Sequence, residues 1–85
     1  MPIEIRVLTA IEEFEAVSEI ESAVWDVHPR DATSPHFLRA TEAAGGVTLG
    51  AFDEQQSMVG MAMAFPAYRG GKVSLWSHMT GVLPG

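Results

Sequence analysis

The stretch VSLWSHMTGVLP, residues 73–84, is rich in β-branched and aromatic residues and predicts a β-strand over residues 73–83. The residues just before it, YRGGK at 68–72, place two glycines between two apolar runs, which is a common signal of a hairpin turn. We therefore expect a loop over residues 66–72 and an antiparallel pairing of the last strand with the apolar run that precedes the loop.

Two further strands are predicted upstream, over residues 47–52 and 58–65, with a polar turn at 53–57 between them. In the second of these strands, large side chains alternate with small ones. The large face holds Val59, Met61, Met63 and Phe65, and the small face holds Met58, Gly60, Ala62 and Ala64. A small face predicts the close approach of another element. We favour a helix there over a ligand, because helices normally cover sheet faces.

A strand and a helix are predicted near the N-terminus. Residues 3–7 alternate apolar with charged side chains, the pattern of a strand with one face in water. Thr9 precedes Glu12 by three residues, a spacing that predicts a capping box at the start of a helix. The helix ends in a loop over residues 27–31. One apolar stripe is expected to face the sheet: Ile11, Phe14, Val17, Ile20 and Val24.

A second, shorter helix is predicted to begin at Ser34 and Pro35 and to end at Gly45 and Gly46. Its inward positions are expected to be Phe37, Leu38, Thr41 and Ala44. The element order is therefore β-α-α-β-β-β, a single α/β (α+β) unit with a mostly antiparallel sheet.

Composition narrows the classes of partner. The 85 residues carry a net charge of −6, and the five basic residues are scattered, so no basic stripe exists for nucleic acid or for an anionic membrane surface. The chain has no cysteine, which fits a reducing compartment, and no apolar run of membrane-spanning length. We expect a cytoplasmic protein that binds neither nucleic acid nor membrane.

The order of elements, together with the last strand, resembles the N-terminal half of the GNAT superfamily of acyl-CoA-dependent N-acetyltransferases. The family pattern at the end of the fourth strand is apolar, any residue, Val, any residue, Pro, and Val82 and Pro84 match it. The strand looks closest to an uncharacterised subgroup of predicted acetyltransferases with a Ser-His-Met-x-Gly-Val strand. The resemblance covers essentially all of residues 1–85.

This resemblance implies acetyl-CoA as the cofactor substrate. In the family the fourth strand splays from its neighbour, and its free backbone groups bind the pantetheine arm and polarise the thioester carbonyl. Carried over to this sequence, that role falls on the backbone of Gly81, Val82 and Leu83.

The resemblance also places His78 near the acceptor amine, where it is a candidate general base. Counting with period 2 puts His78 on one face with Trp76, Thr80 and Val82. The alternative for His78, a structural histidine bonded to a neighbouring carbonyl, stays open. A metal site built from His28, Asp31 and His36 is not expected, since their spacing fits no helical i, i+4 pair.

One departure from the family pattern limits what the chain is expected to do. The family continues after the proline into a glycine-rich loop and a helix whose N-terminus holds the pyrophosphate, and this sequence has neither. The glycines at 70 and 71 are followed by a strand. We expect residues 1–85 to be a partial GNAT-like domain, inactive alone, that in a complete protein serves acetyl transfer to a primary amine.

A rival interpretation is a non-catalytic α/β interaction or small-molecule-sensing module. An apolar last strand forms an edge that needs a partner. This interpretation predicts a homodimer, or association with another protein, through the last strand.

Overall fold

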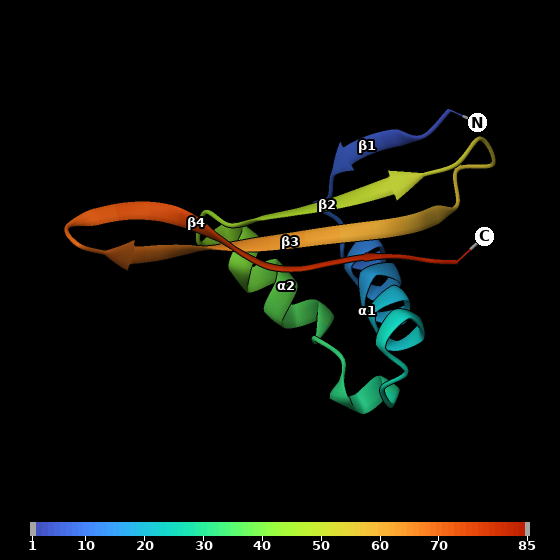
Figure 1. Cartoon of the computed structure of the whole chain (residues 1–85), viewed down its shortest axis with the longest axis horizontal. Helices are drawn as coiled ribbons and strands as arrows, with labels where there is room; N and C mark the ends of the chain where they lie inside the picture. The colour runs from blue at the N-terminus through green and yellow to red at the C-terminus, as the bar shows by residue number, and fades with distance from the viewer. Residues whose placement is uncertain (1, 85) are drawn as a thin grey trace.

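Residues 2–84 are described by the computed structural model, in which a four-stranded antiparallel sheet carries two helices on one face (Figure 1). The strands follow the order of the sequence across the sheet, so the first and the last strand are its edges. The elements are β1 (Glu4–Val7), α1 (Ile11–Trp25), the 3-10 turn η1 (Pro29–Asp31), α2 (Pro35–Ala43), β2 (Val47–Phe52), β3 (Met58–Arg69) and β4 (Lys72–Val82). The predicted element order and α+β class are confirmed.

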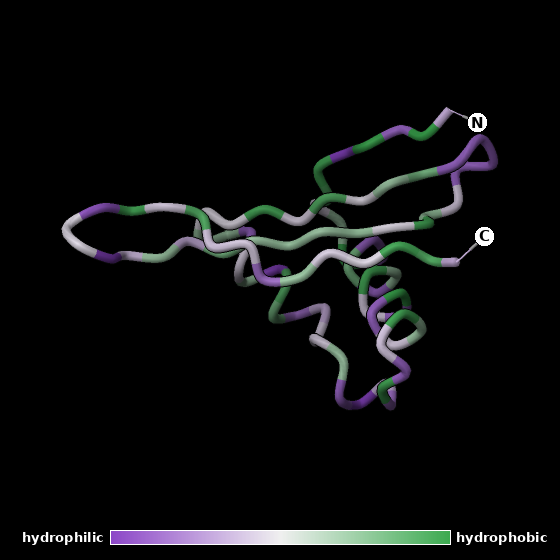
Figure 2. The backbone as a smooth tube through the Cα atoms, viewed as in Figure 1, coloured by the Kyte–Doolittle hydropathy of each residue, from purple (hydrophilic) through white to green (hydrophobic). Residues whose placement is uncertain are grey.

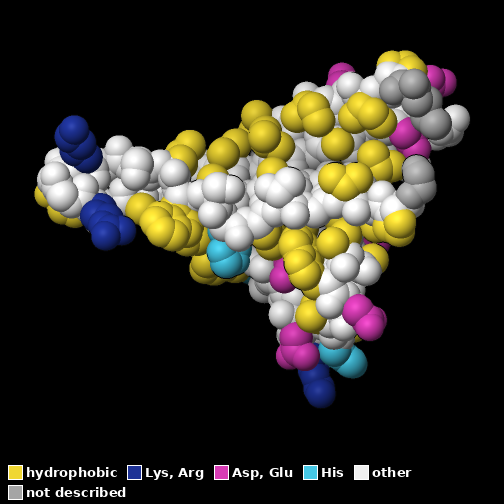
Figure 3. All heavy atoms as spheres, in the orientation of Figure 1, with side chains coloured by type: hydrophobic (Ala, Val, Ile, Leu, Met, Phe, Trp, Pro, Cys, Tyr) yellow, Lys and Arg dark blue, Asp and Glu magenta, His cyan; other side chains and the backbone are white. Residues whose placement is uncertain are grey.

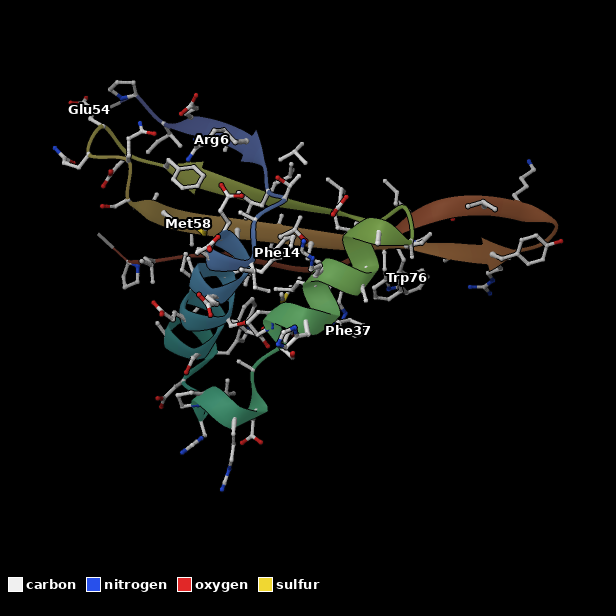
Figure 4. All side chains as sticks on the ribbon, turned by 180° about the vertical axis from the view of Figure 1, so that it is seen from behind. Arg6, Phe14, Phe37, Glu54, Met58 and Trp76 are labelled. Carbon is white, nitrogen blue, oxygen red and sulfur yellow. The ribbon has the colours of Figure 1, made fainter. Side chains whose placement is uncertain are left out.

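The hydrophobic core lies between the helices and the sheet. Figure 4 shows Phe14 reaching from α1 into this layer. The predicted stripe of α1 is confirmed, since its middle three members are buried and its two ends are partly buried. The buried apolar residues are Leu8, Phe14, Val17, Ile20, Leu38, Phe52, Met61 and Met63.

The side chain that caps the N-terminus of α1 is Glu13 and not the predicted Glu12. The N-cap residue is Ala10, one position later than expected, which places Glu13 at the third helical position. Its carboxylate accepts the backbone N–H groups of Thr9 and Ala10, both at 3.1 Å. The reciprocal half of a capping box is missing, because alanine has no side-chain oxygen to offer.

The ends of α2 agree with the sequence analysis. The Ser34 hydroxyl accepts the N–H of His36 at 3.1 Å, and Gly45 follows the helix with φ of 103°. Leu38 is buried, but the predicted inward residue Phe37 is 54% exposed. The reason is that neighbouring residues lie about 100° apart around a helix, so a helix that buries Leu38 turns Phe37 to its flank. Ala44 is also exposed, as the C-cap residue.

The helices cover the large face of β3, so the prediction of a helix on its small face is wrong. Met61 and Met63 are buried beneath the helices. The small residues Gly60 and Ala62 point to the opposite side, which carries no helix in residues 2–84. Long, flexible methionine side chains fill the gap between a sheet and two helices, and small ones leave it empty.

The sheet side without helices is called the open face. Residues paired across strands share a face, so the register defines its members. They are Ile5, Val7, Val47, Leu49, Ala51, Gly60, Ala62, Ala64, Pro66, Tyr68, Val73, Leu75, Ser77, Thr80 and Val82.

Strand β1 contributes its apolar side to the open face. The alternation of β1 is visible in Figure 2, but Ile5 and Val7 are exposed, whereas Arg6 lies over the Phe52 ring on the helix side, 3.8 Å from its centroid. All four residues of β1 are exposed, so the strand buries neither face, and its apolar side chains lie on the side of the sheet without helices.

The β3–β4 hairpin is longer than predicted. Strand β3 continues through Pro66 to Arg69, and the turn consists of Gly70 and Gly71, with φ of 60° and 78°. Positive φ at both central residues is what a tight hairpin turn requires. The hairpin turn is thus confirmed, but most of the predicted loop 66–72 is strand. Residues 65–76 extend beyond the end of β2 and are called the hairpin arm (Figure 1).

Candidate functional site

Strand β4 has one free edge, because β3 is its one partner among residues 2–84. The N–H of Leu83 donates to the carbonyl of Val59 at 2.8 Å. Backbone groups of successive residues in an antiparallel strand point to alternate sides. Given this bond, Gly81 also points toward β3, and Thr80 and Val82 direct their N–H and C=O groups to the free edge.

Because of this alternation, the three residues whose backbone was predicted to bind the cofactor do not all face the same way. Val82 presents its groups to the free edge, while Gly81 and Leu83 face β3. Thr80 was missed by the sequence analysis, although it presents its groups in the same way as Val82. The sequence of β4 does not indicate which of its backbone groups point outward, because that depends on how β4 pairs with β3.

His78 is the extra residue of a β-bulge. Met79 pairs with Met63, but Ser77 pairs with the next residue, Ala64, so His78 has no partner on β3. A bulge changes the direction of the side chain it contains, and bulges are frequent beside active sites.

The bulge overturns the face predicted by period-2 counting. Trp76 pairs with Phe65, which shares the helix side with Met63, whereas Thr80 pairs with Ala62 on the open face. Trp76 and Thr80 therefore lie on opposite faces. Figure 4 shows Trp76 on the side of the sheet that carries α2.

The His78 side chain is exposed, and its ring centroid lies 5.5 Å from that of Phe65 at a tilt of 45°. Among residues 2–84 no hydrogen bond to this ring is formed. The partner required by the structural alternative, a neighbouring carbonyl, is thus not engaged. The imidazole of His78 is therefore accessible from solvent.

The end of α1 supports β4 from the helix side. A Cβ atom at Gly81 would lie 3.1 Å from ring atoms of Trp25 and 3.4 Å from the Val24 side chain. Glycine allows the indole to approach the strand backbone, next to the outward-facing groups of Thr80 and Val82. Trp25 remains 46% exposed, so it packs on β4 without being a fully buried core residue.

The open face contains a shallow hollow of about 170 Å³. Gly60 and Ala62 form its floor, and Ile5, Leu49 and Val82 stand at its rim. Figure 3 shows hydrophobic side chains gathered on this face over the first three strands. The lining is almost wholly apolar, which suits hydrocarbon and offers no group for acid–base chemistry.

The turns at residues 68–72 and 28–31 do not show the features of a phosphate or metal site among residues 2–84. Residues 68–72 form the tip of the hairpin arm and lead into β4, so no helix N-terminus follows them. His28 accepts the N–H of Arg30 through Nδ1 at 3.1 Å, as the cap of η1. Within residues 2–84, no cluster of three His, Cys, Asp or Glu side chains is placed to hold a metal ion. In the same range, no helix has the length and apolar character needed to cross a bilayer.

Two solved acetyltransferase structures share this fold. One is the aminoglycoside antibiotic 6'-N-acetyltransferase AAC(6')-Ih of Acinetobacter baumannii, with a TM-score of 0.64 and 15% identity. The other is an acetyltransferase of Trypanosoma brucei, with a TM-score of 0.68 and 20% identity. The matches cover 98% of this chain, but 58% and 61% of the respective neighbours.

The match establishes a GNAT-like fold, as the resemblance predicted. The chain spans about three fifths of the length of these two structures. No family model and no curated protein matches the sequence.

Proposed function

We propose that the chain is the part of a GNAT-type N-acetyltransferase that binds the thioester end of acetyl-CoA along the free edge of β4. In the complete protein the acetyl group passes to a primary amine. One observation carries the proposal: in a fold shared with two acetyltransferases, the free edge presents the backbone groups of Thr80 and Val82 beside the bulged His78. A cytoplasmic location fits the absence of cysteine.

The backbone of β4 has the chemistry to bind a thioester and its pantetheine arm. Outward N–H groups donate to amide and thioester carbonyls, and outward C=O groups accept from the amide N–H groups of pantetheine. A fixed donor directed at the thioester oxygen stabilises the negative charge that develops there during attack. We assign this role to Thr80 and Val82, with Gly81 and Leu83 holding the strand against β3.

We assign His78 as the general base. Its imidazole takes a proton from the acceptor ammonium, and the freed amine nitrogen attacks the thioester carbonyl carbon. A C–N bond forms, the C–S bond breaks with its electron pair on the CoA sulfur, and the nitrogen loses its second proton, which the thiolate takes up. The acceptor is a primary amine of a class that these residues do not define.

The 85-residue polypeptide is expected not to catalyse the reaction alone. Residues 2–84 contain no helix after β4, so they provide no helix N-terminus for the pyrophosphate. Without that contact acetyl-CoA keeps only its strand-edge interactions. We expect acetyl-CoA to bind this polypeptide with a dissociation constant above the micromolar range.

Calorimetry and NMR test the proposal on the 85-residue polypeptide itself. Calorimetric titration with acetyl-CoA should detect no micromolar binding. Millimolar acetyl-pantetheine should shift the backbone amide signals of Thr80 and Val82, and leave those of Gly81 and Leu83 nearly unchanged. Equal shifts at all four amides, or shifts confined to β1, would contradict binding at the free edge.

The role of His78 is tested in a longer polypeptide that contains these residues. His78→Gln should leave acetyl-CoA binding unchanged and lower kcat about 10²-fold or more, with loss of the rise in rate as the histidine deprotonates. An unchanged rate and pH profile would assign the base elsewhere.

A second function draws on the same edge. A non-catalytic module that dimerises, or associates with another protein, through β4 would use the outward groups of Thr80 and Val82 as hydrogen-bonding partners for another strand. The unpaired edge of β4 favours this candidate. The amide shifts described above distinguish the two functions, because a strand already paired would not respond to acetyl-pantetheine.

A further inference from the structure

The open face carries no charged side chain. The chain has five basic and eleven acidic residues, yet none belongs to this face. The charged residues of the strands, Glu4, Arg6, Arg69 and Lys72, lie on the other face by the same register. Figure 3 shows the basic side chains of the hairpin arm at its tip and acidic ones at the rim of the molecule.

Large apolar side chains on this face are strongly exposed. Six of them, from β1, the arm and β4, are between 57% and 76% exposed: Ile5, Val7, Tyr68, Val73, Leu75 and Val82. Contiguous apolar patches of this kind mark sites of association. The arm adds a second reason, because a two-stranded ribbon without cover is only marginally stable in water.

We infer that the open face binds the open face of a second copy of this chain, in a two-fold sandwich of sheets. A two-fold axis between the sheets and perpendicular to the strands places each arm over the far end of the partner sheet. There the projecting side chains of Tyr68 and Leu75 meet the hollow above Gly60 and Ala62. Large side chains thus face small ones in both halves of the interface.

The size of the face is sufficient for a stable pair. Three strands with six residues each and β1 with its four residues, at about 3.3 Å per residue and 4.8 Å between strands, give a flat area near 350 Å², and the arm adds on the order of 150 Å². Accessible area exceeds flat area because side chains project from it, and stable interfaces bury about 800 Å² per partner. With its projecting side chains, the face therefore approaches the area that a stable pair of this kind buries.

Electrostatic repulsion does not oppose this arrangement. Each copy carries a net charge of −6, but the glutamates of α1 lie behind the sheet. Packed sheets are about 10 Å apart, and each helix layer lies farther out. These distances exceed the Debye length of about 8 Å at physiological ionic strength, so solvent ions screen the charges.

The test is the oligomeric state of the 85-residue polypeptide, measured by light scattering and by sedimentation over a range of concentrations. We expect a discrete dimer. Val7→Lys and Leu75→Lys should each raise the dimer dissociation constant about tenfold or more, since the two-fold axis duplicates every introduced charge. The matched control is Phe37→Lys, which changes a residue of similar exposure on α2 behind the sheet and should leave the dissociation constant unchanged.

Two variants together separate face pairing from edge pairing. Thr80→Pro removes an N–H that points to the free edge, so it abolishes a dimer joined through β4, but Thr80 also lies on the open face. Val7→Lys therefore makes the separation, because Val7 is on β1 at the opposite edge of the sheet and its substitution disrupts only a dimer joined through the open face. Circular dichroism checks the fold of each variant, and Val7→Thr replaces any lysine variant that does not fold. A monomer at all concentrations, or a dimer that Thr80→Pro abolishes and Val7→Lys leaves intact, would overturn the inference. An edge-joined dimer would favour the second function described above, whereas a monomer or a face-joined dimer leaves the free edge of β4 open to acetyl-pantetheine.

Discussion

The hydroxyl of Thr48 is fully buried and has no hydrogen-bond partner among residues 2–84. It lies on the helix side of β2, opposite Met63. A buried hydroxyl without a partner loses its hydrogen bonds to water and gains none in return. Valine has nearly the same shape without that polar atom, and it favours strands.

We therefore expect Thr48→Val to raise the free energy of unfolding by about 1 kcal/mol. Urea denaturation followed by circular dichroism measures the change. Thr80→Val, in the same sheet but exposed, is the control and should change the free energy little. A loss of stability in Thr48→Val would mean that the hydroxyl has a partner in solution.

At the scale of elements, the start of α1 depends on one carboxylate. The N–H groups of Ala10 and Thr9 hold the pKa of Glu13 below its ordinary value, and Arg6 adds a smaller effect in the same direction. A lowered pKa in the folded state means that the ionised carboxylate contributes stability above the ordinary pKa. That contribution is lost as the pH falls through the folded pKa.

Glu13→Gln should therefore flatten the decline in stability between neutral and acidic pH, and should cost about 0.5 kcal/mol at neutral pH because Glu13 is well solvated. Thermal unfolding at a series of pH values measures both effects. Glu12→Gln is the matched control, since its side chain bonds neither amide. If the two variants had the same pH profile, Glu13 would not be the cap.

Local signals account for what the sequence predicted correctly about the elements. Ser34 with Pro35, and Gly45 after α2, set helix ends through bonds within a few residues, and these ends were confirmed. The predictions were wrong where the structure depends on pairing between residues that are distant in the sequence. The bulge at His78 follows from the register of β4 on β3, and no pattern within β4 announces it.

The same distinction holds for the candidate site. Val82 was predicted, but Thr80 emerged only from the bond of Leu83 to Val59, which fixes the phase of the strand. Which face of a strand the helices cover also depends on residues that are distant in the sequence. Alternation in β1 gave two distinct faces, and only the placement of α1 decided that Arg6 would lie on the helix side.

At the scale of the whole molecule, the hairpin arm extends the long axis, and the described chain measures 42 Å in that direction (Figure 1). In the main part of the sheet, β2 and β3 each pair with a strand on both sides, and helices cover one face. The arm has two strands and no helix above them. Local stability should therefore fall steeply from the sheet centre to the arm.

Hydrogen exchange followed by NMR measures that gradient. At concentrations below the dissociation constant of the inferred dimer, we expect paired amides of the arm, such as those of residues 67 and 74, to exchange about a hundredfold faster than the buried amide of Met61. At high concentration, cover by a second copy should slow the arm amides and leave the fully buried Phe14 region of α1 unchanged. Equal protection of arm and centre in the monomer would show that the ribbon is stable alone, because its cross-strand contacts would then outweigh the lack of a third strand.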